Sequence, residues 1–269
     1  MNNEIVSYFV RRACGPLMIL LAGTLFTHCK SNTVNANYPE NRAIIFDGVD
    51  DYVDLGNIYD NLALPVTISV WIWLDPDAAE GFIPIFDSQD GLPEYNGFNF
   101  LTSNISVIGV QYGDGVGENH KAYRRGKSAS ISPIMGRWVN FTAVLRGATE
   151  MQLYVDGVDV GGNYSGESNL PMQSNSPGEV AKIGYLFQNG SVVRFKGRMD
   201  ELKIWNRTLN GEEIKRVIFK RLDETEPGLI GYWNFDEAAG TTLIDHSANH
   251  FDGALKGNPK RTLSEVPLR

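Results

Sequence analysis

Strict alternation of side-chain type over residues 66–74 (VTISVWIWL) is the feature that most limits how this chain can fold. Successive side chains of a β-strand point to opposite faces of its sheet, so a period of two predicts a strand with one apolar face. The segment 138–146 (WVNFTAVLR) repeats the pattern. We therefore expect a core between two sheets, filled by aliphatic rows such as Val66, Ile68, Val70, Ile72 and Leu74.

Turn signals between apolar runs extend this prediction along the chain. Asp156 and Gly157 separate the runs 151–155 and 158–160, and this pair favours a two-residue hairpin because both turn positions need positive φ. We predict further strands at 44–47, 52–55, 82–86, 98–101, 105–112, 180–185, 192–196, 198–205, 229–235 and 252–255.

One late segment has the signals of a short helix. Asn210 is a good N-cap, Glu213 follows three residues later as in a capping box, and apolar residues recur at 214, 217, 218 and 222. Helices do not alternate with strands as βαβ units. The predicted fold class is therefore all-β, with two packed antiparallel sheets and one short late helix.

The first 29 residues differ from the rest of the chain. Arg11 and Arg12 precede an apolar run at 16–26, which is shorter than the roughly 20 residues of a membrane span and suits a signal peptide. We predict a signal peptide at 1–29 and a polar linker at 30–42. The protein is then exported.

Cys29 suggests how the exported protein is held. If cleavage falls just before it, Cys29 becomes the first residue, as in a bacterial lipoprotein anchored by a lipidated cysteine. The segment 26–29 (FTHC) departs from a usual lipobox in having Phe26 and His28. We expect a lipoprotein of the bacterial outer membrane or cell surface, with a secreted or periplasmic protein as the alternative.

Charge and motif content exclude several functions. The formal net charge is −8 and no Lys/Arg cluster is present, which argues against nucleic acid and favours a divalent cation. The segments G-x-S-x-G and H-E-x-x-H are absent. Asp200 and Glu201 are adjacent, so in a regular strand they would face opposite ways and could not work as a pair of catalytic acids. We predict that the protein is not an enzyme.

Four segments together resemble one known family. They are FDGVDDYV at 46–53, the strand at 66–74, the strand and hairpin from 138 to 157, and GRMDELKIWNRTL at 197–209. Together they resemble the laminin-G-like (concanavalin A-like lectin/glucanase) jelly-roll domains of bacterial surface proteins. The resemblance implies a jelly-roll sandwich over 43–257, followed by a C-terminal tail at 258–269. It also leads us to expect that 229–255 forms a final strand pair of the same sandwich rather than a second repeat.

The same resemblance implies a structural calcium ion. Relatives often hold calcium with the aspartates of the FDG and DE segments, which makes Asp47 and Asp200 the first candidate ligands, followed by Asp50 and Asp51. Calcium takes about six to eight oxygen ligands, which carboxylates on a glycine turn can supply. The alternative is that these aspartates cap turns by accepting hydrogen bonds from backbone N–H groups.

Two loop regions have the composition of a sugar-binding surface. Aromatic rings stack on sugars, and amides and carboxylates hydrogen-bond their hydroxyls. The alternative is a polar loop with turn glycines. The candidate ligand-binding residues are Tyr95, Asn96, Tyr112, Asp114, Asn119 and Tyr123.

These observations lead to one leading hypothesis and two alternatives. The leading hypothesis is a non-catalytic, lectin-like recognition module that binds a glycan or an extracellular protein. The alternatives are a glycoside hydrolase with atypical acids and a purely structural or adhesive surface domain. Fold does not fix function, so the sequence does not name the ligand.

Overall fold

The computed structural model describes residues 40–78, 81–89, 95–117, 119, 121–174, 179–188 and 190–269. The predicted signal peptide, Cys29 and most of the predicted linker lie outside the described residues. Residues 39–269 form one compact unit. No helix in the described ranges has the length and apolar character that a membrane span requires.

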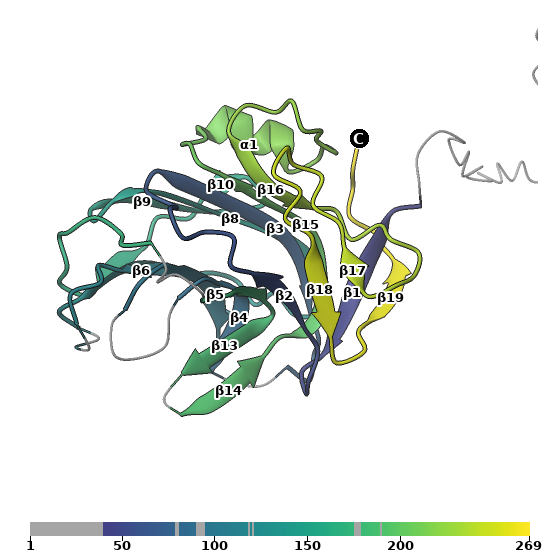
Figure 1. Cartoon of the computed structure of the whole chain (residues 1–269), viewed down its shortest axis with the longest axis horizontal. Helices are drawn as coiled ribbons and strands as arrows, with labels where there is room; N and C mark the ends of the chain where they lie inside the picture. Colours follow the sequence, from purple (N-terminus) through teal and green to yellow (C-terminus); the bar gives the residue numbers. More distant parts are fainter. Residues whose placement is uncertain are drawn as a thin grey trace, which may run out of the picture. The chain divides into compact units, whose positions relative to one another are not determined.

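Two antiparallel sheets face each other across the core (Figure 1). The first, sheet A, has the strand order β10-β9-β8-β3-β15-β1-β19, and β16 also pairs with β15. Its strands are β1 (Arg42–Asp47), β3 (Val66–Leu74), β8 (Trp138–Gly147), β9 (Glu150–Val155), β10 (Val158–Asp159), β15 (Lys196–Trp205), β16 (Leu229–Trp233) and β19 (Lys260–Leu263).

The second, sheet B, has the order β11-β7-β6-β5-β4-β12-β2-β18-β17, and a separate hairpin joins β13 to β14. Its strands are β2 (Tyr52–Gly56), β4 (Phe82–Asp87), β5 (Phe98–Ser103), β6 (Val107–Gly113), β7 (Arg124–Ser130), β11 (Asn163–Ser165), β12 (Ala181–Ile183), β17 (Thr242–Leu243) and β18 (Gly253–Lys256). The hairpin strands are β13 (Tyr185–Gln188) and β14 (Ser191–Arg194). This confirms the predicted all-β sandwich with one short helix.

The alternation of β3 has the consequence that the sequence predicts. Its five aliphatic side chains are all fully buried in the main core between the sheets. The opposite face of β3 is also covered, because Trp71 donates from its indole to the carbonyl of Ile218 at 2.7 Å. Helix α1 (Gly211–Val217) and the residues after it lie on this outer face (Figure 1). Asn210 and Glu213 form the predicted capping box there.

The last strands complete both sheets. β16 pairs with β15 in sheet A, and β18 pairs with β2 in sheet B. The predicted strand pair of 229–255 is therefore divided between the two sheets, and β16 and β18 do not pair with each other. Trp233 and Phe235 are fully buried in the main core. Lys260–Leu263, inside the predicted tail, forms β19 against β1. The segment 260–263 (KRTL) lacks apolar alternation, so side-chain periodicity does not predict this strand. It lies at the edge of sheet A and is held by backbone pairing with β1.

Other differences from the prediction concern polar strands and one turn. β7 is rich in Arg, Ser and Gly, and β11 (NYS) has only three residues, so hydrophobic periodicity misses both strands. The predicted strand 180–185 divides at Gly184, which has φ +75°, into β12 and β13. The Asp156-Gly157 turn has positive φ at both residues, which confirms the predicted hairpin.

Candidate functional site

The turn between β1 and β2 gathers three of the four predicted metal ligands. One ligand oxygen from each of Asp47, Asp50 and Asp51 lies within 4.8 Å of the others. Gly48 has φ +79°, a backbone conformation that glycine adopts without strain and that lets the chain reverse here. The turn therefore brings hard oxygen ligands together at the surface.

Some of these carboxylate oxygens already accept hydrogen bonds from backbone N–H groups. Asp47 Oδ1 accepts from the N–H groups of Val49 at 2.7 Å and Asp50 at 3.3 Å. Asp51 accepts from Asp47 N–H at 3.0 Å and from Asn258 N–H at 2.8 Å. Within the described residues, the Asp50 carboxylate makes no hydrogen bond. The turn-capping alternative thus describes Asp47 and Asp51, whereas Asp50 offers both oxygens.

The carboxylates of this turn influence one another's ionisation. Burial raises the pKa of Asp51 above its ordinary value, and the neighbouring charges of Asp47 and Asp50 raise it further. Burial by itself would also raise the pKa of Asp47, but backbone N–H groups from Val49 and Asp50 lower it below its ordinary value. A bound divalent cation would relieve the repulsion among these three groups.

The fourth predicted ligand, Asp200, lies elsewhere. Asp47 pairs with Lys196 in the β1–β15 register, so Asp200 stands four residues further along, about 13 Å at roughly 3.3 Å per residue. Its side chain is fully buried and accepts from the Ser264 hydroxyl at 2.5 Å. The structure therefore does not bring Asp200 to the acidic turn.

A β-bulge corrects the expectation that Asp200 and Glu201 face opposite ways. β15 pairs with β1 up to Met199 and with β16 from Leu202 onward, and the register also shifts here against β3. Glu201 has φ +56° at this handover. Met199 and Leu202 both reach the main core, so the two acids between them lie on the outer face together.

The bulge creates a buried ionic cluster under α1. Glu201 pairs with Lys203 at 2.6 Å and accepts from the Tyr232 hydroxyl at 3.0 Å. Lys203 also donates to the carbonyls of Val217 at 3.1 Å and Lys220 at 2.7 Å. Burial, and then the charge of Glu201, raise the pKa of Asp200 well above its usual value. All three ionisable side chains are 1 % exposed or less, so this cluster stabilises the fold and offers no surface for a substrate.

The residues predicted to bind a ligand lie largely in one loop cluster at one end of sheet B. Asp114 N–H donates to Tyr123 O at 3.1 Å, and Gly115 N–H donates to Tyr95 O at 2.9 Å. The guanidinium of Arg124 lies 3.9 Å from the centre of the Tyr95 ring. Burial, the main cause, lowers the pKa of Arg124 to about 10.

Most of these side chains support the loops themselves. Tyr112 belongs to the main core and donates to Leu170 O at 2.9 Å. Asp114 accepts from the Ser168 hydroxyl and from Val116 N–H. Asn119 accepts from two backbone N–H groups of its own turn, and Asn96 is buried. The polar-loop alternative accounts for these four side chains.

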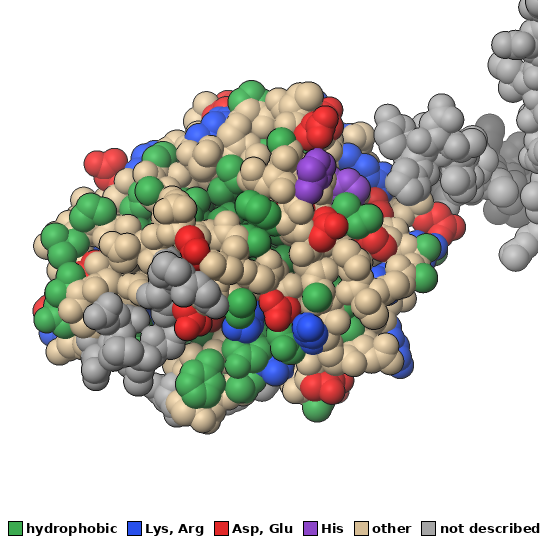
Figure 2. All heavy atoms as spheres, in the orientation of Figure 1, with side chains coloured by type: hydrophobic (Ala, Val, Ile, Leu, Met, Phe, Trp, Pro, Cys, Tyr) green, Lys and Arg blue, Asp and Glu red, His purple; other side chains and the backbone are tan. Residues whose placement is uncertain are grey.

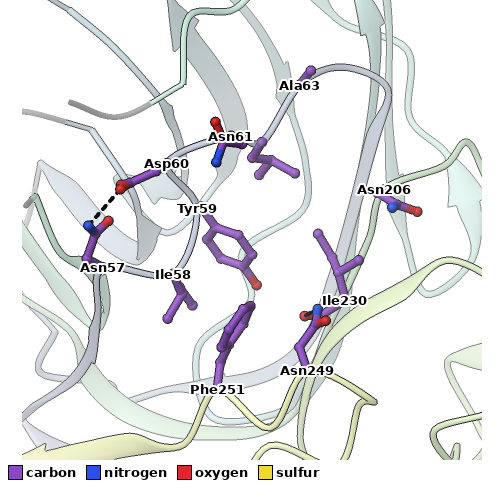
Figure 3. A pocket seen from close by; sticks show the side chains of 11 residues that line it. Asn57, Ile58, Tyr59, Asp60, Asn61, Ala63, Asn206, Ile230, Asn249 and Phe251 are labelled. Carbon is purple, nitrogen blue, oxygen red and sulfur yellow. Dashed lines mark hydrogen bonds between the residues drawn. The ribbon is translucent and has the colours of Figure 1, made fainter. Parts of the chain in front are cut away.

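A surface pocket of about 580 Å³ lies between the β2–β3 loop and the C-terminal strands (Figure 3). Five of its residues carry a carboxamide or carboxylate, and the remainder are aromatic or aliphatic. The lining residues are Asn57, Ile58, Tyr59, Asp60, Asn61, Leu62, Ala63, Asn206, Ile230, Asn249 and Phe251.

Tyr59 forms the floor of this pocket. It is 3 % exposed, and its ring packs edge-on against Phe86 and Phe251, with centroids 6.1 and 6.3 Å apart. Its hydroxyl points toward the wall formed by Ile230 and Asn249 in Figure 3. That hydroxyl is buried without a hydrogen-bond partner among the described residues. Burial, and then the charge of Asp245, raise the pKa of Tyr59 well above its usual value.

Sequence reasoning misses this pocket because its two walls come from distant segments. Residues 57–63 (NIYDNLA) fall between the predicted strands 52–55 and 66–74, and Ile230, Asn249 and Phe251 lie far along the chain. The available signal is the density of asparagine beside aromatic residues in 57–61 and 249–251, which has no meaning until the walls meet.

The comparisons with known proteins agree with this fold. The family model described as the concanavalin A-like lectin/glucanases superfamily, of laminin-G type, matches residues 47–215. The chain belongs to this superfamily, as the sequence resemblance predicts. No curated protein matches.

Solved structures show the same fold at low sequence identity. A protein from Bacteroides ovatus, described as a candidate carbohydrate-binding protein, is 14% identical with a TM-score of 0.61. The alignment covers 86% of this chain and 62% of that one. A carbohydrate-binding domain of a Ruminococcus gnavus sialidase, solved with sialyllactose, is 12% identical with a TM-score of 0.48, covering 65% of this chain and 95% of that one. The chain thus shares its fold with the protein from Bacteroides ovatus.

Acidic and basic side chains are mixed on one face of the molecule (Figure 2). On the face drawn in Figure 2, acidic and basic side chains are interspersed rather than gathered into one basic patch. Nucleic-acid binding usually relies on clustered Lys and Arg.

Proposed function

We propose that this protein is an exported, lipid-anchored recognition module that binds a glycan without cleaving it. The observation that carries the proposal is the pocket beside Tyr59, which combines exposed carboxamides with aromatic and aliphatic walls. Its volume of about 580 Å³ lies within the roughly 300–1,000 Å³ typical of small-ligand sites. The carbohydrate-binding function described for proteins of the same fold supports the choice of a glycan over a protein ligand.

The chemistry of the pocket suits a sugar. Carboxamides of Asn57, Asn61, Asn206 and Asn249 are exposed and can both donate to and accept from hydroxyl groups. The Phe251 ring is partly exposed and can pack against the C–H face of a sugar. Asp60 supplies a single carboxylate, whereas hydrolysis of a glycosidic bond usually needs two carboxyl groups flanking the bond.

A glycan array probed with the purified mature domain tests this proposal. We expect binding to a limited set of glycans without hydrolysis, and loss of binding in Phe251→Ala. Val158→Ala is the control, because Val158 is also an exposed apolar side chain but lies outside the pocket. Release of sugar products would establish the glycosidase alternative, and failure to bind any glycan would favour the structural or adhesive one.

A calcium ion at the β1–β2 turn is a second part of the proposal. The donor set is oxygen only, which suits a hard cation, and Asp47, Asp50 and Asp51 would hold it. Backbone carbonyls and water would have to supply the remaining ligands, because calcium takes about six to eight. The ion would tie the start of β2 to the β18–β19 turn, since Asp51 already accepts from Asn258.

The anchoring proposal depends on Cys29 alone. We expect Cys29→Ser to release the protein from the membrane fraction and to abolish acyl labelling. A wild-type protein without label, starting at another residue, would establish simple secretion instead.

A further inference from the structure

The pocket has walls of two different origins. Residues 57–63 and Asn206 lie within the part of the chain that matches the superfamily model, residues 47–215. Ile230, Asn249 and Phe251 lie after it. The pocket is therefore completed by a segment beyond the matched region, and its chemistry belongs to this chain.

Asp245 holds the second wall in place. It is fully buried and accepts from the N–H groups of Tyr232 at 2.7 Å and Ser247 and Phe251 at 2.9 Å. It also accepts from the Ser247 hydroxyl at 2.8 Å. These bonds fix the loop 245–251 against β16, so the wall is rigid before any ligand arrives.

The polar side chains of the two walls present acceptor oxygens, which suit a ligand that donates hydrogen bonds from hydroxyl groups. Asn249 donates from its carboxamide to Ile230 O at 2.9 Å, which turns its oxygen into the free acceptor. Asp60 Oδ2 accepts from the Asn57 carboxamide at 2.7 Å, as Figure 3 shows. Asp60 Oδ1 is buried and has no hydrogen-bond partner within the described residues.

The charge of the lining points the same way. Its only ionisable groups are Asp60 and Tyr59, and no Lys, Arg or His lines the pocket in the described part of the chain. An acidic sugar would bring its carboxylate beside Asp60 without a cation to compensate, and like charges repel more strongly where water is excluded.

We propose that the pocket binds a neutral sugar residue, with Asp60 accepting from one of its hydroxyl groups and Phe251 packing on its C–H face. This inference rests on the proposed glycan-binding function and specifies the class of glycan.

Calorimetric titration of the purified mature domain with paired oligosaccharides tests the proposal. Each pair consists of a neutral oligosaccharide selected on the array and its counterpart carrying a uronic or sialic acid at the terminal position. We expect the neutral member to bind at least about tenfold more tightly. A factor of this size corresponds to the loss of one charge-assisted hydrogen bond, or to the repulsion between the ligand carboxylate and Asp60.

Asp60→Asn is the diagnostic variant, because it keeps the shape and removes the charge. We expect it to weaken binding of the neutral sugar about tenfold. We also expect the ratio between the dissociation constants of the acidic and the neutral sugar to fall. Asp77→Asn makes the same chemical change at an exposed position outside the pocket and should alter neither.

The outcomes separate the two levels of the argument. Equal or tighter binding of the acidic member, abolished by Phe251→Ala, would overturn the neutral-sugar inference and leave glycan binding standing. Binding of neutral sugars that Phe251→Ala and Asp60→Asn both leave unchanged would overturn the assignment to this pocket. Absence of binding to either member would overturn the proposed function itself.

Discussion

Two acidic regions of this molecule resemble each other in sequence and differ in their surroundings. The turn at Asp47–Asp51 is mostly exposed, has no lysine or arginine within ion-pair distance among the described residues, and offers free carboxylate oxygens. The pair Asp200–Glu201 is fully buried beneath α1, with Lys203, Tyr232 and Ser264 as partners. A carboxylate near the surface can bind a cation, whereas one inside the protein must be paired or protonated. The local environment, rather than the residue type, therefore decides the role.

The largest expected effect is a loss of stability caused by a substitution in the buried region. Lys203→Met keeps most of the aliphatic stem and removes the ammonium group, which leaves Glu201 buried without its counter-ion. It also removes the donor that Lys203 supplies to the carbonyls of Val217 and Lys220. Removal of one partner from a buried ion pair typically costs about 3–5 kcal/mol. We expect the free energy of unfolding, measured in urea, to fall by that amount.

A double variant sharpens this result. Glu201→Leu combined with Lys203→Met removes both charges, and we expect it to recover part of the loss because no unpaired charge remains. A loss below about 1 kcal/mol for Lys203→Met alone would contradict the ion pair as the structure has it.

The next largest effect concerns the exposed turn. If calcium binds there, a hundredfold excess over the dissociation constant should stabilise the fold by about 2.7 kcal/mol, and a chelator should remove this gain. Asp50→Asn should reduce the calcium-dependent rise in melting temperature without changing the metal-free value, since the Asp50 carboxylate makes no hydrogen bond among the described residues. Differential scanning fluorimetry with and without chelator measures both quantities.

Asp200→Asn is the matched control, because it makes the same change in the buried region. It should leave the calcium response intact. Loss of the calcium response in Asp200→Asn but not in Asp50→Asn would show that Asp200 is a metal ligand, as the sequence resemblance implies, and that Asp50 is not.

The smallest effect is a difference in pH dependence. Asp200 has a pKa raised above its usual value of 3.8 in the folded protein, so its contribution to stability is full below that pH and is lost as the pH rises through the folded pKa. Asp47 has a lowered pKa, so its contribution is present above pH 3.8 and is lost as the pH falls through the folded value. Asp200 and Asp47 should therefore contribute to the pH dependence of stability with opposite sign, whereas Asp51, whose pKa is raised, contributes in the same direction as Asp200.

Urea unfolding between pH 3 and pH 8 tests this difference in sign. Asp200→Asn keeps a neutral, hydrogen-bonding side chain, so we expect a change of about 1 kcal/mol or less at low pH and a weaker decline above pH 4. Asp47→Asn should instead weaken the decline at acidic pH. Parallel curves for wild type and both variants would contradict the assigned directions.

How much could be predicted from the sequence differs between these regions. The acidic turn could be predicted because all its residues are local, and a glycine in a short turn holds them together. The position of Asp200 could not, because it depends on the β1–β15 register, which places Asp200 four residues beyond Lys196, the partner of Asp47. The pocket could not either, because Tyr59 and Phe251 meet only when β2 and the last strands are in place.

The sequence by itself determined the elements and the fold class. Strand β3, the Asp156-Gly157 hairpin and the capped helix follow from side-chain period and turn chemistry, which depend on a few neighbouring residues. Only the tertiary structure decided which distant segments share a surface, since the pocket that Asp60 and Asn249 both line depends on strand order and register. Local forces fix the conformation of the backbone, and burial and pairing across the chain fix the environment of each side chain, from which a binding site is made.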